Sequence, residues 1–230
     1  MDNFEKLIES CDENLKFYSK KLTEVRTTLK LYDEVIKLLE TESNDLINLK
    51  RSIVFVGHLL IPFLELSVTL KNLVNAKTDW EKIFFIKNSY LTIFESLKII
   101  RPEKNCTTIL DENINSNNLK ELKPELEKCN GKITNFRNSE DYELIESVRH
   151  YTAGHIDKNF KLYYDTIISL DGEKSGQIVS KFMEILSDVL TLSQKVESRL
   201  LKIYESKAEI STKELKEKLK QLEELLKNYG

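Results

Sequence analysis

Two of the chain's three histidines lie in one polar heptapeptide, RHYTAGH, which runs from Arg149 to His155. Histidine changes its protonation near neutral pH and can therefore act as a general acid or a general base. Arginine keeps its positive charge and presents a planar pair of donors that fits two oxygens of a phosphate group. The residue types of this segment are thus suited to proton transfer on a phosphate compound.

The same segment also has an ordinary structural interpretation. Glu146 and Glu143 lie one turn or more upstream, so an ion pair along one helix would account for Arg149. His150 and His155 would then be surface or partly buried polar residues. The third histidine, His58, lies in the apolar stretch SIVFVGHLL and is predicted to be a core residue.

A single straight helix does not bring Arg149 and His155 together. Six residues of α-helix turn through about 600°, which leaves the two side chains roughly 120° apart around the axis and about 9 Å apart along it. Either the helix begins or is distorted within the segment, for which Gly154 is the candidate, or a second chain completes the site.

The spacing Arg149-x5-His155, with His150 directly after the arginine and Ile156-Asp157-Lys158 following, resembles the Rx4–6H motif of HEPN domains. These are α-helical domains found in ribonuclease toxins, abortive-infection proteins and nucleotidyltransferase-associated proteins. The resemblance extends over residues 139–170, and the long N-terminal and C-terminal helices lie outside the family's core pattern.

The resemblance implies a metal-independent endoribonuclease of a toxin or phage-defence system, with no cofactor. It implies that His155 transfers protons, that Arg149 binds and stabilises the phosphate, and that His150 orients or assists. Tyr151 and Lys158 are the expected RNA contacts. It also implies a homodimer, because HEPN motifs of two protomers face each other across a dimer axis. An antitoxin or another partner protein is possible. The alternative to a ribonuclease is a non-catalytic HEPN-like binding domain.

Tyrosines near the motif have two interpretations. Tyr151, Tyr163 and Tyr164 could stack on RNA bases. Tyrosines at helical spacing are, however, more often core or interface residues.

Charge and cysteine usage narrow the class of protein. The formal net charge is −3, which argues against a broad basic surface, so we expect no sequence-specific duplex DNA as partner. Cys11, Cys106 and Cys129 include no CxxC pair, and the sequence therefore supports neither a zinc site nor a disulfide framework. Reduced cysteines indicate a cytoplasmic protein.

Six glycines and three prolines in 230 residues are too few for a turn-dense β fold, and apolar residues recur at helical spacing, so we predict an all-α helical bundle. The first helix is predicted over residues 3–42 and the second over 45–76. Thr78 and Glu81 form a capping-box pattern that opens a third helix, ending at Ile100.

The second half of the chain is predicted as a loop followed by four helices. The loop covers 102–118, a short helix covers 119–129 and ends at Asn130-Gly131, and a helix capped by Ser139 reaches Ser169. A long amphipathic helix follows, and a second capping box at Ser211 opens the last helix. We divide the chain into a HEPN-like domain, 1–206, and a C-terminal amphipathic helix, 207–230.

For two segments the sequence allows two different environments. Residues 52–70 are nearly long enough to span a bilayer, but His58, Pro62 and Glu65 favour a buried central helix, and no membrane contact is expected. The last helix carries one apolar seam, which either packs on its own bundle or self-associates. In the competing functional class, such seams bind partner proteins and the motif is a chance match.

Overall fold

A computed structural model describes residues 3–39, 44–100, 107–153 and 159–229. Within these ranges every regular element is helical, which confirms the all-α bundle. In chain order the elements are α1 (Asn3–Leu39), α2 (Asn44–Asn75), α3 (Asp79–Ile99), α4 (Thr107–Ser116), η1 (Lys120–Leu122), α5 (Lys123–Arg137), α6 (Glu140–Val148), η2 (Arg149–Ala153), α7 (Phe160–Ile168) and α8 (Gly172–Tyr229).

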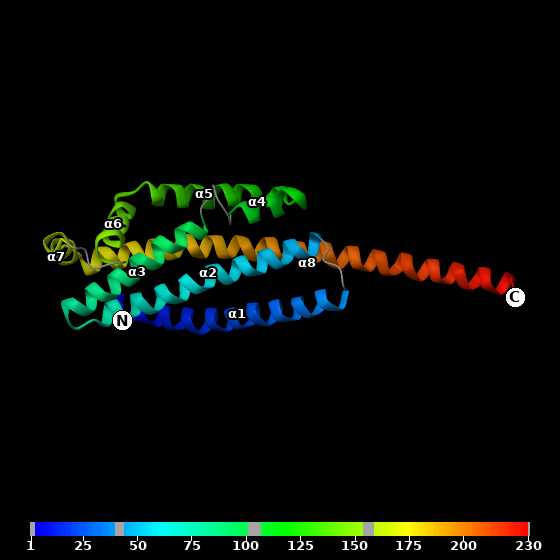
Figure 1. Ribbon diagram of the computed structural model, residues 1–230, viewed down its shortest axis with the longest axis horizontal. Helices are drawn as coiled ribbons and strands as arrows, with labels where there is room; N and C mark the ends of the chain where they lie inside the picture. The colour runs from blue at the N-terminus through cyan, green and yellow to red at the C-terminus, as the bar shows by residue number, and fades with distance from the viewer. Residues whose placement is uncertain (1–2, 40–43, 101–106, 154–158, 230) are drawn as a thin grey trace.

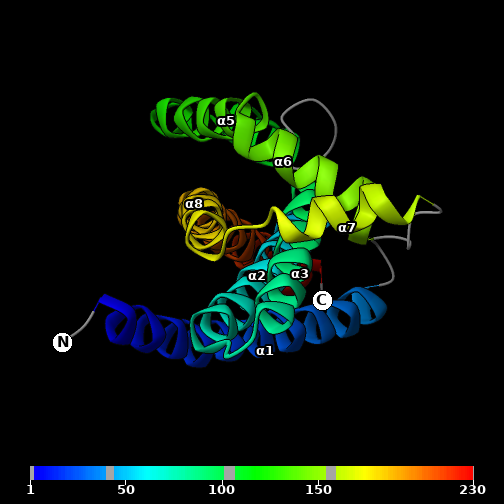
Figure 2. The ribbon, with the colours of Figure 1, turned by 90° about the vertical axis from the view of Figure 1, so that its left-hand side faces the viewer.

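The bundle is elongated, and its long helices run side by side (Figure 1). Helix α2 lies at the centre and packs against α1, α3 and α8. Helices α4 and α5 lie along the other side of α8, while α6 and α7 close one end of the bundle (Figures 1 and 2). The core thus collects one apolar face from each long helix, as amphipathic helices require.

The second helix is both the most apolar element and the centre of the fold. It is the one helix in the described ranges that is long and apolar enough to cross a membrane, and more than half of its apolar window is buried inside the bundle. Its neighbours α1, α3, α4 and α8 leave one narrow stripe of it uncovered. This stripe has helical spacing and consists of His58, Ile61, Glu65 and Val68.

The prediction that His58 is a core residue is therefore wrong. The surrounding sequence is apolar on every side of the helix, so its pattern does not identify which side the neighbouring helices cover. His58 lies on the uncovered stripe, in a shallow groove with Glu65 and Leu91.

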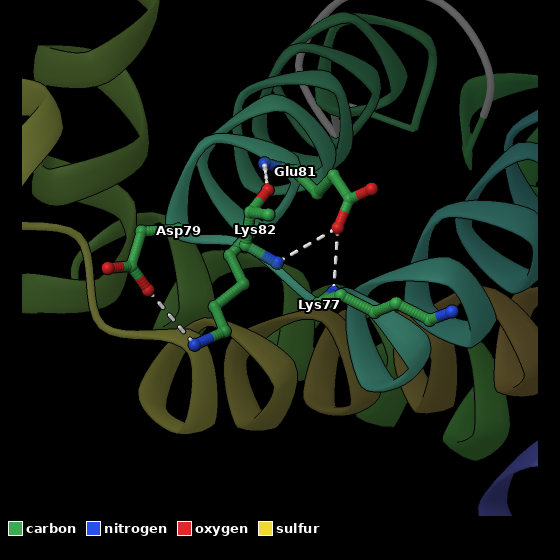
Figure 3. A network of polar contacts seen from close by, with 5 residues as sticks. Lys77, Asp79, Glu81 and Lys82 are labelled. Atoms are coloured by element: carbon green, nitrogen blue, oxygen red, sulfur yellow. Dashed lines mark hydrogen bonds and ion pairs between the residues drawn. The ribbon is translucent and has the colours of Figure 1, made fainter.

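Helix α3 begins with the predicted capping box (Figure 3). The backbone N–H of Glu81 donates to Oγ1 of Thr78 at 3.2 Å, and the Glu81 carboxylate accepts from the backbone N–H of Thr78 at 2.9 Å. The same carboxylate accepts from the backbone N–H of Lys77 at 2.7 Å. These backbone donors, Lys77 first, lower the pKa of Glu81.

Removing the cap should destabilise the bundle measurably. Replacing an N-cap threonine with alanine typically costs about 1 kcal/mol, so we expect Thr78→Ala to lower the melting temperature by roughly 2–4 °C in circular dichroism. Thr23→Ala is the control, since the exposed Thr23 hydroxyl only donates to the carbonyl of Ser19 within α1. Equal melting temperatures for the two variants would show that the cap contributes nothing.

The loop predicted over 102–118 is partly wrong, because α4 occupies Thr107–Ser116; residues 102–106 lie outside the described ranges. Leu110 and Ile114 of α4 are buried. Between them, the amide of Asn113 donates to Oγ of Ser52 at 2.8 Å. The polar, asparagine-rich sequence is thus held as a helix by one buried face and one buried hydrogen bond.

The predicted end of the next helix at Asn130-Gly131 is also wrong, since α5 continues to Arg137. Ile133 and Phe136 lie beyond the glycine and are fully buried. Gly131 is exposed, and a Cβ built on it would contact nothing within 4 Å. Burial of the last turns therefore outweighs the modest cost of a glycine inside a helix.

The two long helices predicted for the C-terminal third form one helix, α8. It runs without a break through Ser211, where a new helix was expected, and through the predicted boundary between residues 206 and 207. Among the side chains whose burial is described, Leu200 is the last buried one of α8, and the last turns of the helix project far beyond the bundle (Figure 1). The division into a domain and an extension stays a prediction.

Glu197 of α8 provides a pH-dependent test of this packing. Burial raises the pKa of its carboxyl group, and the charge of Lys21 opposes the rise only in part. The folded chain therefore holds this proton more tightly than the unfolded chain, and the contribution to stability is lost as the pH rises through the folded pKa. At neutral pH the ionised carboxylate weakens the fold.

We expect Glu197→Gln to raise the melting temperature by about 1–2 °C at pH 7, a small effect because the group is partly solvated. The gain should shrink as the pH falls through the raised folded pKa of Glu197, because protonation removes the buried charge. The matched control is Glu205→Gln, an exposed glutamate of the same helix. A lower melting temperature for Glu197→Gln at pH 7 would contradict this interpretation.

Candidate functional site

The helix predicted over residues 139–169 is interrupted at the motif. Helix α6 begins after Ser139, as expected, although the Ser139 hydroxyl donates to the carbonyl of Phe136 and does not cap the helix. The α-helix ends at Val148, and Arg149–Ala153 form a π-helical turn. The continuous helix predicted to reach Ser169 is therefore wrong, and the π-helical turn matches one of the two alternatives, a helix distorted within the motif. Gly154, the residue expected to cause the distortion, lies outside the described residues.

A buried side-chain hydrogen bond lies within the π-helical turn. Its Thr152 is buried, and the Thr152 hydroxyl donates to the carbonyl of Val148 at 2.7 Å. Because π-helical hydrogen bonds join residues five apart, the angular offsets of a regular α-helix do not apply here. Such turns occur frequently at functional sites.

Arg149 is the best-defined member of the site. Its guanidinium carbon lies 4.9 Å from the ring centroid of Phe94, on α3. Its Nε atom is buried and has no hydrogen-bond partner, and no ion pair joins Arg149 to Glu143 or Glu146 in the described ranges. The ion-pair interpretation of Arg149 is therefore not what the structure shows.

The Phe94 ring, which contacts Arg149, has two further neighbours. Tyr142 of α6 stacks parallel to Phe94, with centroids 6.4 Å apart and planes 2° apart. Lys98 also lies over the Phe94 ring, at 4.8 Å. Sequence reasoning missed Phe94, because nothing in the pattern of α3 indicates that this residue meets the motif.

The histidines of the motif are placed unequally. His150 is exposed, and its ring meets the ring of Tyr151 edge-on at 4.8 Å. Tyr151 is half-buried. The remaining predicted site residues, His155, Gly154 and Lys158, lie outside the described residues. The predicted cleft shared by His155 and Arg149 stays a prediction.

The tyrosines after the motif divide into two kinds. Tyr163 packs against α3, where its hydroxyl accepts a hydrogen bond from Nζ of Lys87 at 3.2 Å. Tyr164 is exposed and stacks on the exposed Phe160, with centroids 5.8 Å apart. Tyr163 thus has the packing role, while Tyr164 and Phe160 present aromatic surface that a nucleic-acid base could cover.

Other hollows of the fold lie away from the motif. A groove of about 780 Å³ opens beside the start of α8, lined by apolar residues of α2 and by charges of both signs, among them Lys82, Asp171 and Lys181. In the described part of the chain, no three His, Cys, Asp or Glu residues gather as a metal site would require. In the part of the chain that the structure describes, the motif combines the predicted chemistry with an arginine that has no carboxylate partner.

No family model, curated protein or solved structure matches the chain.

Proposed function

We propose that the protein is a HEPN-like, metal-independent endoribonuclease that acts as a homodimer in a toxin or phage-defence system. In this proposal Arg149 binds the phosphate, His155 transfers protons and His150 assists, while Tyr151 and Lys158 contact the RNA. The observation that carries the proposal is the environment of Arg149. Its guanidinium lies on an aromatic ring and has no carboxylate partner in the described ranges. The assay is cleavage of single-stranded RNA in EDTA.

Three further features support the proposal. The regular α-helix ends directly before Arg149 and a π-helical turn follows, so the motif does not lie on one regular helix. His150 is exposed and can reach a bound polymer. An all-α fold is also what the resemblance to HEPN domains implies.

The alternative is a non-catalytic helical protein that binds a nucleotide or a partner protein, an antitoxin included, through its amphipathic seams. One observation favours it: the end of α8 projects beyond the bundle, while its sequence keeps apolar residues at three- and four-residue steps (Figure 1). A solvated helix with one apolar seam is typical of coiled-coil association.

Assembly is the first property to measure. Both the motif and the projecting helix lead us to expect sedimentation at about twice the chain mass of 26.9 kDa at micromolar concentration. A strictly monomeric protein at these concentrations would remove the proposal of a composite site.

Aspartate at Leu222 and Leu226 separates two roles of the last helix. Charge in the seam should leave the melting temperature of the bundle unchanged, because this part of α8 projects beyond the bundle (Figure 1). Loss of the dimer with full helical content would assign the seam to self-association. Loss of helical content would instead show that the seam packs on its own bundle.

A further inference from the structure

We propose that Phe94 is the positioning residue of Arg149: its ring holds the guanidinium in place and leaves the positive charge free for a phosphate oxyanion. The inference rests on the proposed function, in which Arg149 binds the phosphate of RNA. Phe94 belongs to α3 and lies outside the motif itself, so it adds a second element to the site.

The contacts of Arg149 identify the ring as its support. The guanidinium carbon is 4.9 Å from the Phe94 centroid, within the range of a cation–π interaction. Nε is buried and makes no hydrogen bond in the described ranges, so hydrogen bonding does not orient the group there. A planar guanidinium stacks well on an aromatic face, which fixes its plane.

The choice of a ring over a carboxylate has an electrostatic consequence. A carboxylate would position an arginine but would also neutralise it, whereas an aromatic face attracts the cation through its quadrupole and carries no net charge. Lys98, on the same ring, shows the contrast, because both oxygens of Glu95 accept from its Nζ at 2.7 Å. Of the two cations on this ring, only Lys98 has a carboxylate partner among the described residues.

The ring can act as a support because its own position is fixed. Ile93 and Leu97 beside it on α3 are buried in the core. Tyr142 of α6 stacks parallel to it, and α6 leads directly into the π-helical turn. Phe94 thus lies between buried core residues of α3 and the guanidinium of Arg149, and the packing of α3 positions the ring.

A spectroscopic measurement tests the contact without any RNA. In ¹H–¹⁵N spectra the Nε–H signal of Arg149, assigned by its loss in Arg149→Lys, should be shifted upfield by the ring current of Phe94. Phe94→Leu should return the signal to the usual arginine position, and Phe94→Tyr should keep the shift. A signal that does not move in Phe94→Leu overturns the proposal.

RNA affinity tests whether the Phe94 contact keeps Arg149 available for phosphate. The probe is a 2′-O-methyl RNA oligonucleotide, which lacks the 2′-hydroxyl nucleophile and cannot be cleaved by its own 2′ oxygen. Phe94→Leu should weaken its binding by about 3- to 10-fold, and Phe94→Tyr should restore it. Phe94→Glu should lose as much as Arg149→Ala, because the new carboxylate neutralises the guanidinium. Wild-type affinity in Phe94→Leu or Phe94→Glu overturns the proposal.

Phe85→Leu is the matched control, since Phe85 is a partly buried phenylalanine of the same helix that packs against the core and contacts the ring of Phe84. It should leave both the Arg149 signal and RNA affinity unchanged. An equal loss of affinity in Phe85→Leu and Phe94→Leu would show a general effect on folding and overturn the specific role of Phe94.

The same variants separate this inference from the ribonuclease proposal. If the wild type binds but does not cleave RNA, and Phe94→Leu weakens binding, the role of Phe94 stands and the nuclease proposal fails. If cleavage requires Arg149 but Phe94→Leu keeps wild-type kcat and KM, the role of Phe94 fails alone. If no RNA binds, titration with inorganic phosphate decides: the Arg149 signal should move in the wild type and not in Phe94→Leu, and an unmoved wild-type signal overturns the inference.

Discussion

Alanine at His155 or at Arg149 should lower the rate of RNA cleavage by about 100- to 10,000-fold, because each change removes a group that acts only on the reacting phosphate. His155→Ala removes the proton-transfer group and Arg149→Ala removes the fixed cation. His150→Ala should cost less, since His150 is assigned an assisting role. The measurement is single-turnover cleavage of a single-stranded RNA, with growth of expressing cells as a second readout.

These variants are informative only if they stay folded and dimeric. Circular dichroism and sedimentation should match the wild type, since neither Arg149 nor His150 is a fully buried core residue. His58→Ala is the histidine control: the side chain is exposed on α2, so we expect wild-type cleavage and a wild-type melting temperature. If cleavage survives in both motif variants, the helical interaction protein becomes the better description.

Leu186→Ala should destabilise the protein by about 3 kcal/mol, because it opens a cavity in the centre of the bundle. Leu186 of α8 is 0 % exposed and belongs to the core cluster. A loss of this size corresponds to a fall of roughly 5–12 °C in the melting temperature of a chain of this length. Thermal unfolding followed by circular dichroism measures it.

Leu201→Ala is the matched control, since Leu201 lies on the same helix and is 43 % exposed. The identical substitution removes the same atoms but leaves no enclosed cavity, so its effect should be well under half that of Leu186→Ala. Equal effects would contradict the burial of Leu186 in the core of the bundle.

The first three helices could be predicted closely from the sequence because strong local signals define them. The three- and four-residue steps predict α1, and the capping box at Thr78 predicts the start of α3. In both cases the signal lies within one turn or repeats along the whole helix. The structure therefore differs from the prediction by only a few residues there.

Later elements could not be predicted because tertiary contacts override local preference. Helix α4 depends on the hydrogen bond from Asn113 to Ser52, residues far apart in the sequence. Helix α5 continues through Gly131 because Ile133 and Phe136 are buried beyond it. The exposure of His58 depends likewise on which sides of α2 its neighbours cover, and a continuously apolar pattern does not contain that information.

The candidate site divides in the same way. The motif itself can be read from residue types and spacing, and the need for a distorted helix follows from helical geometry. The partner of Arg149 could not be predicted, because Phe94 reaches it only through the packing of α3 against α6 and η2. The tyrosines required the structure to distinguish the packed Tyr163 from the exposed Tyr164.

Analysis of the RNA ends produced by the wild-type protein in EDTA tests the proposed ribonuclease most directly. In the proposed reaction the 2′ oxygen of the RNA forms a bond to phosphorus as its proton passes to a base, and the bond to the 5′ oxygen breaks as that oxygen gains a proton. The products should therefore carry 2′,3′-cyclic phosphate and 5′-hydroxyl ends without any divalent metal. Cleavage that appears only when metal is added, or products with 3′-hydroxyl and 5′-phosphate ends, would contradict the mechanism.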